Sequence, residues 1–154
     1  MDVVSVAETP LAPIAASALA TTFSHIGEGE TPWRADGLRS FFLYRDLGVA
    51  EATNGQVIAQ LVKANLAPEE GTGWHRHEAT FHIVIMLKGW ARFMYESTET
   101  LVKAGDCVHQ RPGIVHYLFD YSPDMEYLEV VGPADFTTID VDGPCPIPPP
   151  TPWK

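Results

Sequence analysis

The sequence is short of the residues that build several large classes of protein. It has two cysteines, Cys107 and Cys145, in 154 residues, which is too few for a disulfide framework and predicts two reduced thiols in a cytoplasmic protein. Lysine and arginine total 10 against 20 aspartates and glutamates, so the formal net charge is -10. Nucleic acids and anionic membrane surfaces bind basic faces, and we expect neither as a partner. No run approaches the roughly 18 apolar residues of a membrane span.

The residues that are abundant favour a β-rich domain. Hydrophobic residues make up 45% of the chain and charged residues 19%, as in globular proteins. Glycine and proline are frequent, at 12 and 13 residues, and mark turns between short strands. Six of the prolines fall within 144–152 and predict a polyproline-like tail. We therefore divide the chain into an N-terminal arm (1–32), a β-barrel (33–141) and a Pro-rich tail (142–154).

The central segment shows a succession of short apolar or alternating runs separated by Gly and Pro turns. Such runs, at intervals of roughly 8 to 12 residues, predict a β-sandwich or barrel with little helix. The turn pair Asn54-Gly55 favours a hairpin turn before the second run. The expected strands are 40–44, 56–66, 81–88, 90–96, 98–103, 107–110, 115–121 and 126–131.

Histidines are concentrated in the middle of the chain. His75 and His77 are two residues apart and face the same side of a strand. His82 begins the next strand, and His116 follows a Pro-Gly turn on a later one. Imidazoles that converge from different strands provide the donors that transition metals prefer.

The spacing of these histidines resembles the first sequence motif of the cupin superfamily of small β-barrels. That motif has a glycine, a His-x-His pair, a glutamate after three or four residues, and a glycine after six more. Here the corresponding residues are Gly71, His75, His77, His82 and Gly89, so that a histidine stands where the family has its glutamate.

The second cupin motif has a glycine, then a Pro-Gly pair, then two residues of any type and a histidine. The chain has Gly105, Pro112-Gly113 and His116 in this order. The resemblance implies an all-β fold, a single-domain cupin double-stranded β-helix or jelly-roll barrel. It also implies a divalent transition metal held by His75, His77, His82 and His116. Alternatively, His82 stands off the metal and leaves a three-histidine site.

The resemblance also implies a class of chemistry. Fe(II) is the expected ion, with Zn, Ni, Cu and Mn as alternatives. The expected function is a non-haem Fe(II) dioxygenase that acts on a small chelating diketone, hydroxyketone or aromatic substrate with O2. The alternatives are a Zn- or Ni-dependent lyase or isomerase, and a non-catalytic module that binds a metal or small ligand. Four neutral imidazoles would leave the ion a net charge of about +2, which favours an anionic substrate.

Strand parity predicts the lining of the metal cavity. If His82 points inward, alternate residues of its strand do so as well, and the other, apolar face of this strand meets another sheet or a second subunit. We therefore expect a homodimer. The pocket residues expected on this basis are Val84, Met86, Phe93, Tyr95 and Leu118. Plain core packing is the alternative role for the aromatic residues.

Three further polar residues lie near the motifs. His109 precedes the Pro-Gly turn and is a candidate to orient a ligand or to transfer protons, with a surface position as the alternative. Asp120 shares the parity of His116 and is expected on the same face. Arg111 is expected in an exposed salt bridge, with attraction of an anionic substrate near the barrel mouth as the alternative.

Overall fold

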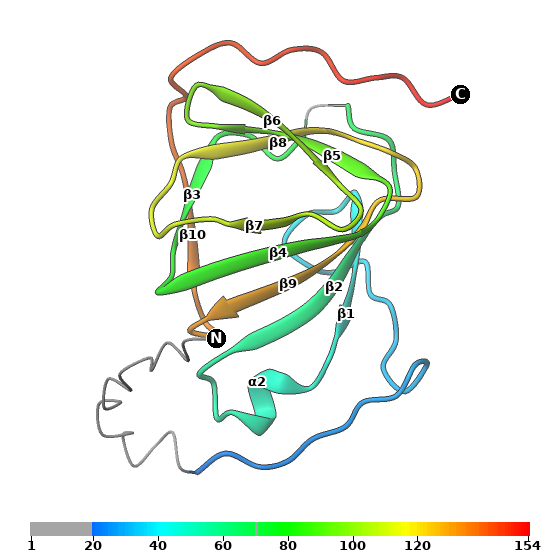
Figure 1. The fold of residues 1–154 in the computed structure, drawn as a ribbon, viewed down its shortest axis with the longest axis vertical. Coiled ribbons are helices and arrows are strands. Elements are labelled where there is room, and N and C mark those ends of the chain that lie inside the picture. Colours follow the sequence, from blue (N-terminus) through cyan, green and yellow to red (C-terminus); the bar gives the residue numbers. More distant parts are fainter. Residues whose placement is uncertain (1–19, 70) are drawn as a thin grey trace, which may run out of the picture.

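Two five-stranded antiparallel sheets make up the protein, and they face each other around a common interior (Figure 1). The computed structural model describes residues 20–69 and 71–154. The first sheet has the strand order β1-β2-β9-β4-β7, and the second has the order β10-β3-β8-β5-β6. The only helix in the described part is one turn, α2 (Val49–Ala52). The protein is therefore an all-β jelly-roll barrel, and the predicted fold class is confirmed.

The strands of the first sheet are β1 (Phe42–Asp46), β2 (Ile58–Ala64), β4 (Phe81–Lys88), β7 (Cys107–His109) and β9 (Glu126–Gly132). Those of the second are β3 (His75–Glu78), β5 (Trp90–Tyr95), β6 (Thr98–Lys103), β8 (His116–Tyr121) and β10 (Thr137–Asp140).

The sequence pattern located most of these strands but missed two elements. β4 and β6 coincide with the predicted runs, whereas β1 begins two residues later than expected. β10 was not predicted; it is a four-residue edge strand that pairs with β3 and has no buried residue of its own. The short helix α2 was also missed. Asn54 and Gly55 have positive φ values, as a tight turn requires, but they follow α2 instead of joining two strands directly.

Alternating burial fixes which side chains enter the interior. On β4, His82, Val84 and Met86 are buried, while Phe81 and Ile83 are partly exposed on the outer face. The inward parity predicted for this strand is therefore correct. The largest side chains that are almost fully buried are Tyr121, Phe42, Phe119, Met86, Met125, Val62, Val102 and Val131.

A β-bulge in β8 changes the parity predicted for Asp120. The register between β5 and β8 shifts so that Phe93 pairs with Leu118 whereas Arg92 pairs with Asp120, which leaves Phe119 as an extra residue. Asp120 is fully buried, and it accepts a hydrogen bond from Arg92 Nη1 at 3.0 Å. It is not among the residues that line the histidine cavity, so the expectation that it shares the face of His116 is wrong.

The Pro-rich tail has no regular secondary structure, yet it lies against the second sheet (Figure 1). The Thr151 amide and hydroxyl donate hydrogen bonds to the two carboxylate oxygens of Asp120, at 3.0 and 2.8 Å. Trp153 packs on the ring of Tyr121, and its Nε1–H donates to the Tyr121 carbonyl at 3.0 Å. The tail therefore supplies the hydrogen bonds that a buried carboxylate requires.

Both cysteines are free, Cys107 exposed and Cys145 partly buried. In the described part of the chain, no helix has the length and apolar character to cross a membrane. Residues 1–19 of the predicted N-terminal arm lie outside the described residues.

Candidate metal centre

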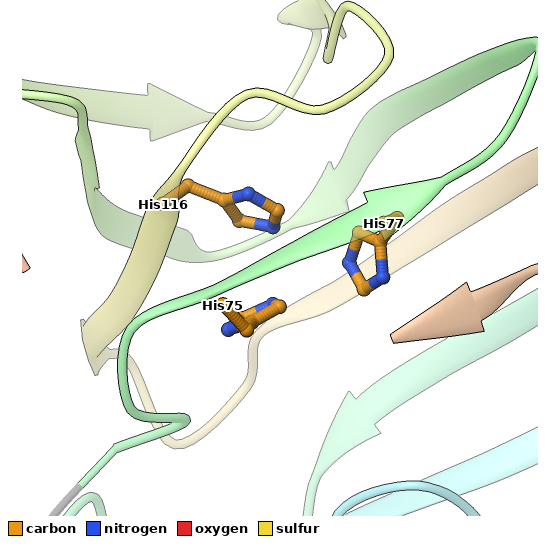
Figure 2. Close-up of side chains that lie close together, drawn as sticks. All are labelled: His75, His77 and His116. Atoms are coloured by element: carbon orange, nitrogen blue, oxygen red, sulfur yellow. The ribbon is translucent and has the colours of Figure 1, made fainter. Parts of the chain in front are cut away.

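Three buried histidines meet inside the barrel on two neighbouring strands. His75 and His77 lie on β3, and His116 begins β8, where it pairs directly with His75. One ring nitrogen from each residue can be chosen so that all three lie within 4.8 Å of one another. Figure 2 shows the three imidazoles turned toward a shared space. We refer to these residues as the histidine triad.

Hydrogen bonds hold each triad ring in one orientation. The Nδ1 atom of His75 lies 2.8 Å from the Gly73 carbonyl, and that of His116 lies 2.9 Å from the Ile114 carbonyl. A carbonyl only accepts, so both Nδ1 atoms carry the proton and both Nε2 atoms keep a free lone pair. His77 Nδ1 lies 2.8 Å from the Thr138 hydroxyl on β10. Such outer hydrogen bonds are the usual support of metal-binding histidines.

The surroundings also keep the triad uncharged. Burial lowers the pKa of His77 to about 2, and repulsion from His116 and His75 adds to the effect. Burial likewise lowers the pKa of His116 to about 3, and it lowers that of His75. The three side chains are therefore neutral at pH 7. Neutral, buried and oriented imidazoles, with a free Nε2 lone pair on His75 and His116, fit a divalent transition metal.

The fourth predicted ligand, His82, lies beside the triad but has different partners. Its ring centroid is 5.1 Å from that of His77. The Tyr95 hydroxyl donates to Gln110 Oε1 at 2.8 Å, which turns the amide nitrogen of Gln110 toward His82 Nδ1 at 3.1 Å. His82 Nδ1 then accepts a hydrogen bond, and the proton of the neutral ring lies on Nε2.

His82 Nε2 faces a carboxylate that the sequence motifs did not reveal. It lies 2.6 Å from Glu129 Oε1, although the two are not aligned as a hydrogen bond. The other carboxylate oxygen, Oε2, accepts a hydrogen bond from Gln60 at 2.9 Å. Burial raises the pKa of Glu129, but its contacts with His82 and Gln60 outweigh burial, and the net pKa is lowered. The site thus contains an ionised carboxylate, whereas the sequence predicted imidazoles alone.

A signal for Glu129 was present in the strand pattern. It shares the parity of Tyr127 and Val131 on β9, and all three side chains are buried. A glutamate on the buried face of a central strand needs a polar partner. Because β9 lies between β2 and β4, its polar partners are Gln60 on β2 and His82 on β4.

The triad and the His82–Glu129 pair border a cavity of about 150 Å³ between the two sheets. Of the predicted pocket residues, Val84, Phe93 and Leu118 line this cavity. Met86 is buried in the core instead, and Tyr95 reaches the site through Gln110.

Two of the polar residues near the motifs, His109 and Arg111, do not line this cavity. His109 is exposed at the end of β7 and does not line the cavity. Arg111 forms an ion pair with Glu96, and both side chains are more than half exposed.

The other cavity residues come from segments without a sequence motif. They include Arg39, on the loop before β1, and Phe136, on the loop before β10. Phe136 contacts the His77 ring edge to face, with centroids 5.4 Å apart. Nothing in the local sequence marks Arg39, since its place in the site depends on how the loop folds over the barrel.

Comparisons with known proteins agree with the jelly-roll fold. A family model described as Cupin domain matches residues 62–131, which include the whole triad. No curated protein sequence matches the chain. An RmlC-like cupin from Shewanella frigidimarina is similar in structure, with a TM-score of 0.59 and 14% identity over 75% of this chain and 96% of that chain.

Two other solved structures have named activities. The polyketide cyclase RemF from Streptomyces resistomycificus has a TM-score of 0.63 and 14% identity, covering 80% of this chain and 90% of its own. A predicted oxalate decarboxylase from Thermotoga maritima has a TM-score of 0.51 and 27% identity, covering 59% of this chain and 79% of its own. The Cupin domain model therefore covers the part of the chain that holds the histidine triad, and the solved cupin structure shares its jelly-roll fold.

Proposed function

We propose that the protein is a metal-dependent enzyme acting on a small chelating substrate, with a non-haem Fe(II) dioxygenase as the principal candidate. The observation that carries the proposal is the histidine triad. Its three imidazoles are neutral, are oriented by contacts at their Nδ1 atoms, and border a cavity. Three ligands leave open coordination positions for a substrate. A bound divalent metal would supply Lewis acidity and, if it is iron, one-electron chemistry with O2.

The protein residues around the triad would bind and orient the substrate. Val84, Phe93 and Leu118 provide an apolar wall that excludes water. The volume of about 150 Å³ suits a substrate of a few non-hydrogen atoms. Gln60 and Gln110 hold Glu129 and His82 in place, so that the polar groups of the cavity are set before a substrate arrives.

The His82–Glu129 pair supports a second candidate, a Lewis-acid lyase or isomerase. These enzymes move a proton to or from a carbon or oxygen of a metal-polarised substrate, which requires an acid or base beside the metal. Glu129 is ionised and can accept a proton, and His82 presents Nε2–H to the same region. In a dioxygenase the same pair would deprotonate the chelating substrate as it binds.

Metal analysis and oxygen consumption test the proposal together. We expect about one equivalent of transition metal in protein purified without added metal, and its loss in His77→Ala and His116→Ala. His109→Ala is the matched control and should keep the metal, because His109 is exposed outside the cavity. A wild-type protein that binds no metal with measurable affinity refutes the proposal.

The identity of the metal separates the two candidates. Iron, with O2 uptake on β-diketones or hydroxyketones, supports the dioxygenase. Stoichiometric zinc or nickel without O2 uptake on that panel rejects the dioxygenase and supports the Lewis-acid enzyme.

A further inference from the structure

The loop before β1 places one cationic side chain in the histidine cavity. Gly37, Leu38 and Arg39 all line it, and Arg39 is the only lysine or arginine that does so among the described residues. The charge of Arg39 reaches the triad electrostatically: after the dominant effect of burial, it contributes to lowering the pKa of both His75 and His77.

The guanidinium group has a polar atom without a partner. Arg39 Nη2 is buried and makes no hydrogen bond within the described part of the chain. The carboxylate of Glu129 lines the same cavity, but among the described residues its contacts are with His82 and Gln60, and no ion pair joins it to Arg39. A buried N–H donor without an acceptor is costly, and native proteins nearly always satisfy one. A ligand in the cavity can provide the missing acceptor.

The loop that carries Arg39 is held in a fixed position. The Arg39 backbone N–H donates a hydrogen bond to the Tyr44 hydroxyl at 3.0 Å. Gly37 lies directly on the Tyr44 ring, where an added Cβ would collide with the ring carbons. Tyr44 belongs to β1 and lines the cavity itself. The backbone that carries the guanidinium is therefore supported by a strand of the barrel, which favours a preorganised binding group.

We propose that Arg39 binds a carboxylate group of the substrate, so that the site selects small carboxylic acids that also reach the histidine triad. This inference rests on the proposed function for the role of the triad, but the Arg39 contact itself needs no metal. A guanidinium presents parallel N–H donors that match the two oxygens of a carboxylate, and such charge-assisted pairs are among the stronger hydrogen bonds in proteins. The cavity volume limits the substrate to a short-chain acid.

The test compares two probes of nearly equal shape, propionate and propionamide, which differ in charge. Binding is measured by calorimetry on the full chain, both metal-free and loaded with the metal it retains on purification. We expect propionate to bind both forms of the wild type and to bind metal-free Arg39→Gln at least tenfold more weakly. Propionamide should bind weakly to both. Arg39→Lys should bind propionate more tightly than Arg39→Gln but more weakly than wild type, because lysine keeps the positive charge but lacks the two parallel N–H donors.

Arg34→Gln is the matched control. It removes the same charge five residues away, where the side chain is exposed and paired with Asp36. It should bind propionate like the wild type. Thermal unfolding of each variant checks that the loop change leaves the barrel folded.

Each remaining outcome overturns one proposal specifically. Propionate that fails to bind the metal-free wild type, or binds metal-free Arg39→Gln as tightly as wild type, overturns the role of Arg39. Binding that appears with metal and is unchanged in Arg39→Gln means that the metal alone holds the carboxylate, which overturns the inference and leaves the proposed function standing. Arg39-dependent binding in a protein that takes up no metal overturns the proposed function and leaves the inference standing.

Discussion

Acidification should destabilise the metal-free protein well before its carboxylates are protonated. His77 and His116 are neutral in the folded state, since burial lowers their pKa to about 2 and about 3. In the unfolded chain both return to a pKa of about 6.5. The unfolded state therefore binds more protons between pH 6.5 and 3, and the free energy of unfolding must fall as the pH falls through that window.

The size of the effect follows from these values. At pH 5.5 the solution is one pH unit below the histidine pKa in the unfolded chain. Each histidine that stays neutral in the folded state then lowers the free energy of unfolding by about 1.4 kcal/mol relative to pH 7.5. His77 and His116 together give a loss of about 3 kcal/mol. The pKa of His75 is lowered by burial as well, so that it acts in the same direction. A loss of this size is a large fraction of the stability of an ordinary domain.

Urea unfolding at a series of pH values, with a chelator present throughout, measures the effect. In His116→Gln the dependence on pH between 7.5 and 5.5 should be clearly shallower, whatever the change in absolute stability. His109→Gln is the control with no expected change in slope, because His109 is exposed in the folded chain. A wild-type stability that is constant or rises between pH 7.5 and 5.5, or a His116→Gln slope equal to that of wild type, would refute the reasoning.

Two further pairs of substitutions test the packing of the barrel, with the urea midpoint as the measurement. Gly89→Ala should lower the free energy of unfolding by about 3 kcal/mol or more, because φ is +65° and the new Cβ would collide with the Ser122 side chain. Gly105→Ala has a φ of +96° but open space around the new Cβ, so it should lower the free energy of unfolding by only about 2 kcal/mol through backbone strain. Equal losses for the two variants would contradict the collision at Gly89. Trp153→Ala should cost about 2 kcal/mol through lost packing on Tyr121, and Trp153→Phe about 1 kcal/mol through the lost Nε1 hydrogen bond. A neutral Trp153→Ala would mean that the tail does not stabilise the barrel.

Local patterns were sufficient to locate most of the strands and the triad. Alternation and Gly/Pro turns reflect burial along a single strand, so β4 and β6 were located to the residue. His75, His77 and His116 could be grouped because the motif spacing corresponds to strands that meet in a known barrel. β10 escaped detection because an edge strand with no buried residue has no clear hydrophobic alternation.

The remainder of the site depends on contacts between strands that are distant in the sequence. His82 was predicted as a ligand by its position in the motif, but its partners come from β9 and from the residue after β7. Arg39 enters the cavity through a loop whose path is set by Tyr44. The face of Asp120 was predicted incorrectly because a bulge adds one residue to β8, and no residue type in that strand marks the bulge.

The direct pairing of His75 with His116 has a consequence for the edge of the second sheet. β3 and β10 form an antiparallel pair at this edge of the sheet. In the pairing between β3 and β8, the residues that stand opposite each other are His75 and His116. An ion bound by the triad would therefore join the outer two strands to the rest of the sheet. By mass action, free metal at a hundred times its dissociation constant adds about 2.7 kcal/mol to the free energy of unfolding. Amide hydrogen exchange in β3 and β10 measures how often this edge of the sheet opens. Slower exchange in these two strands then reports that the metal is bound, without any assay of turnover.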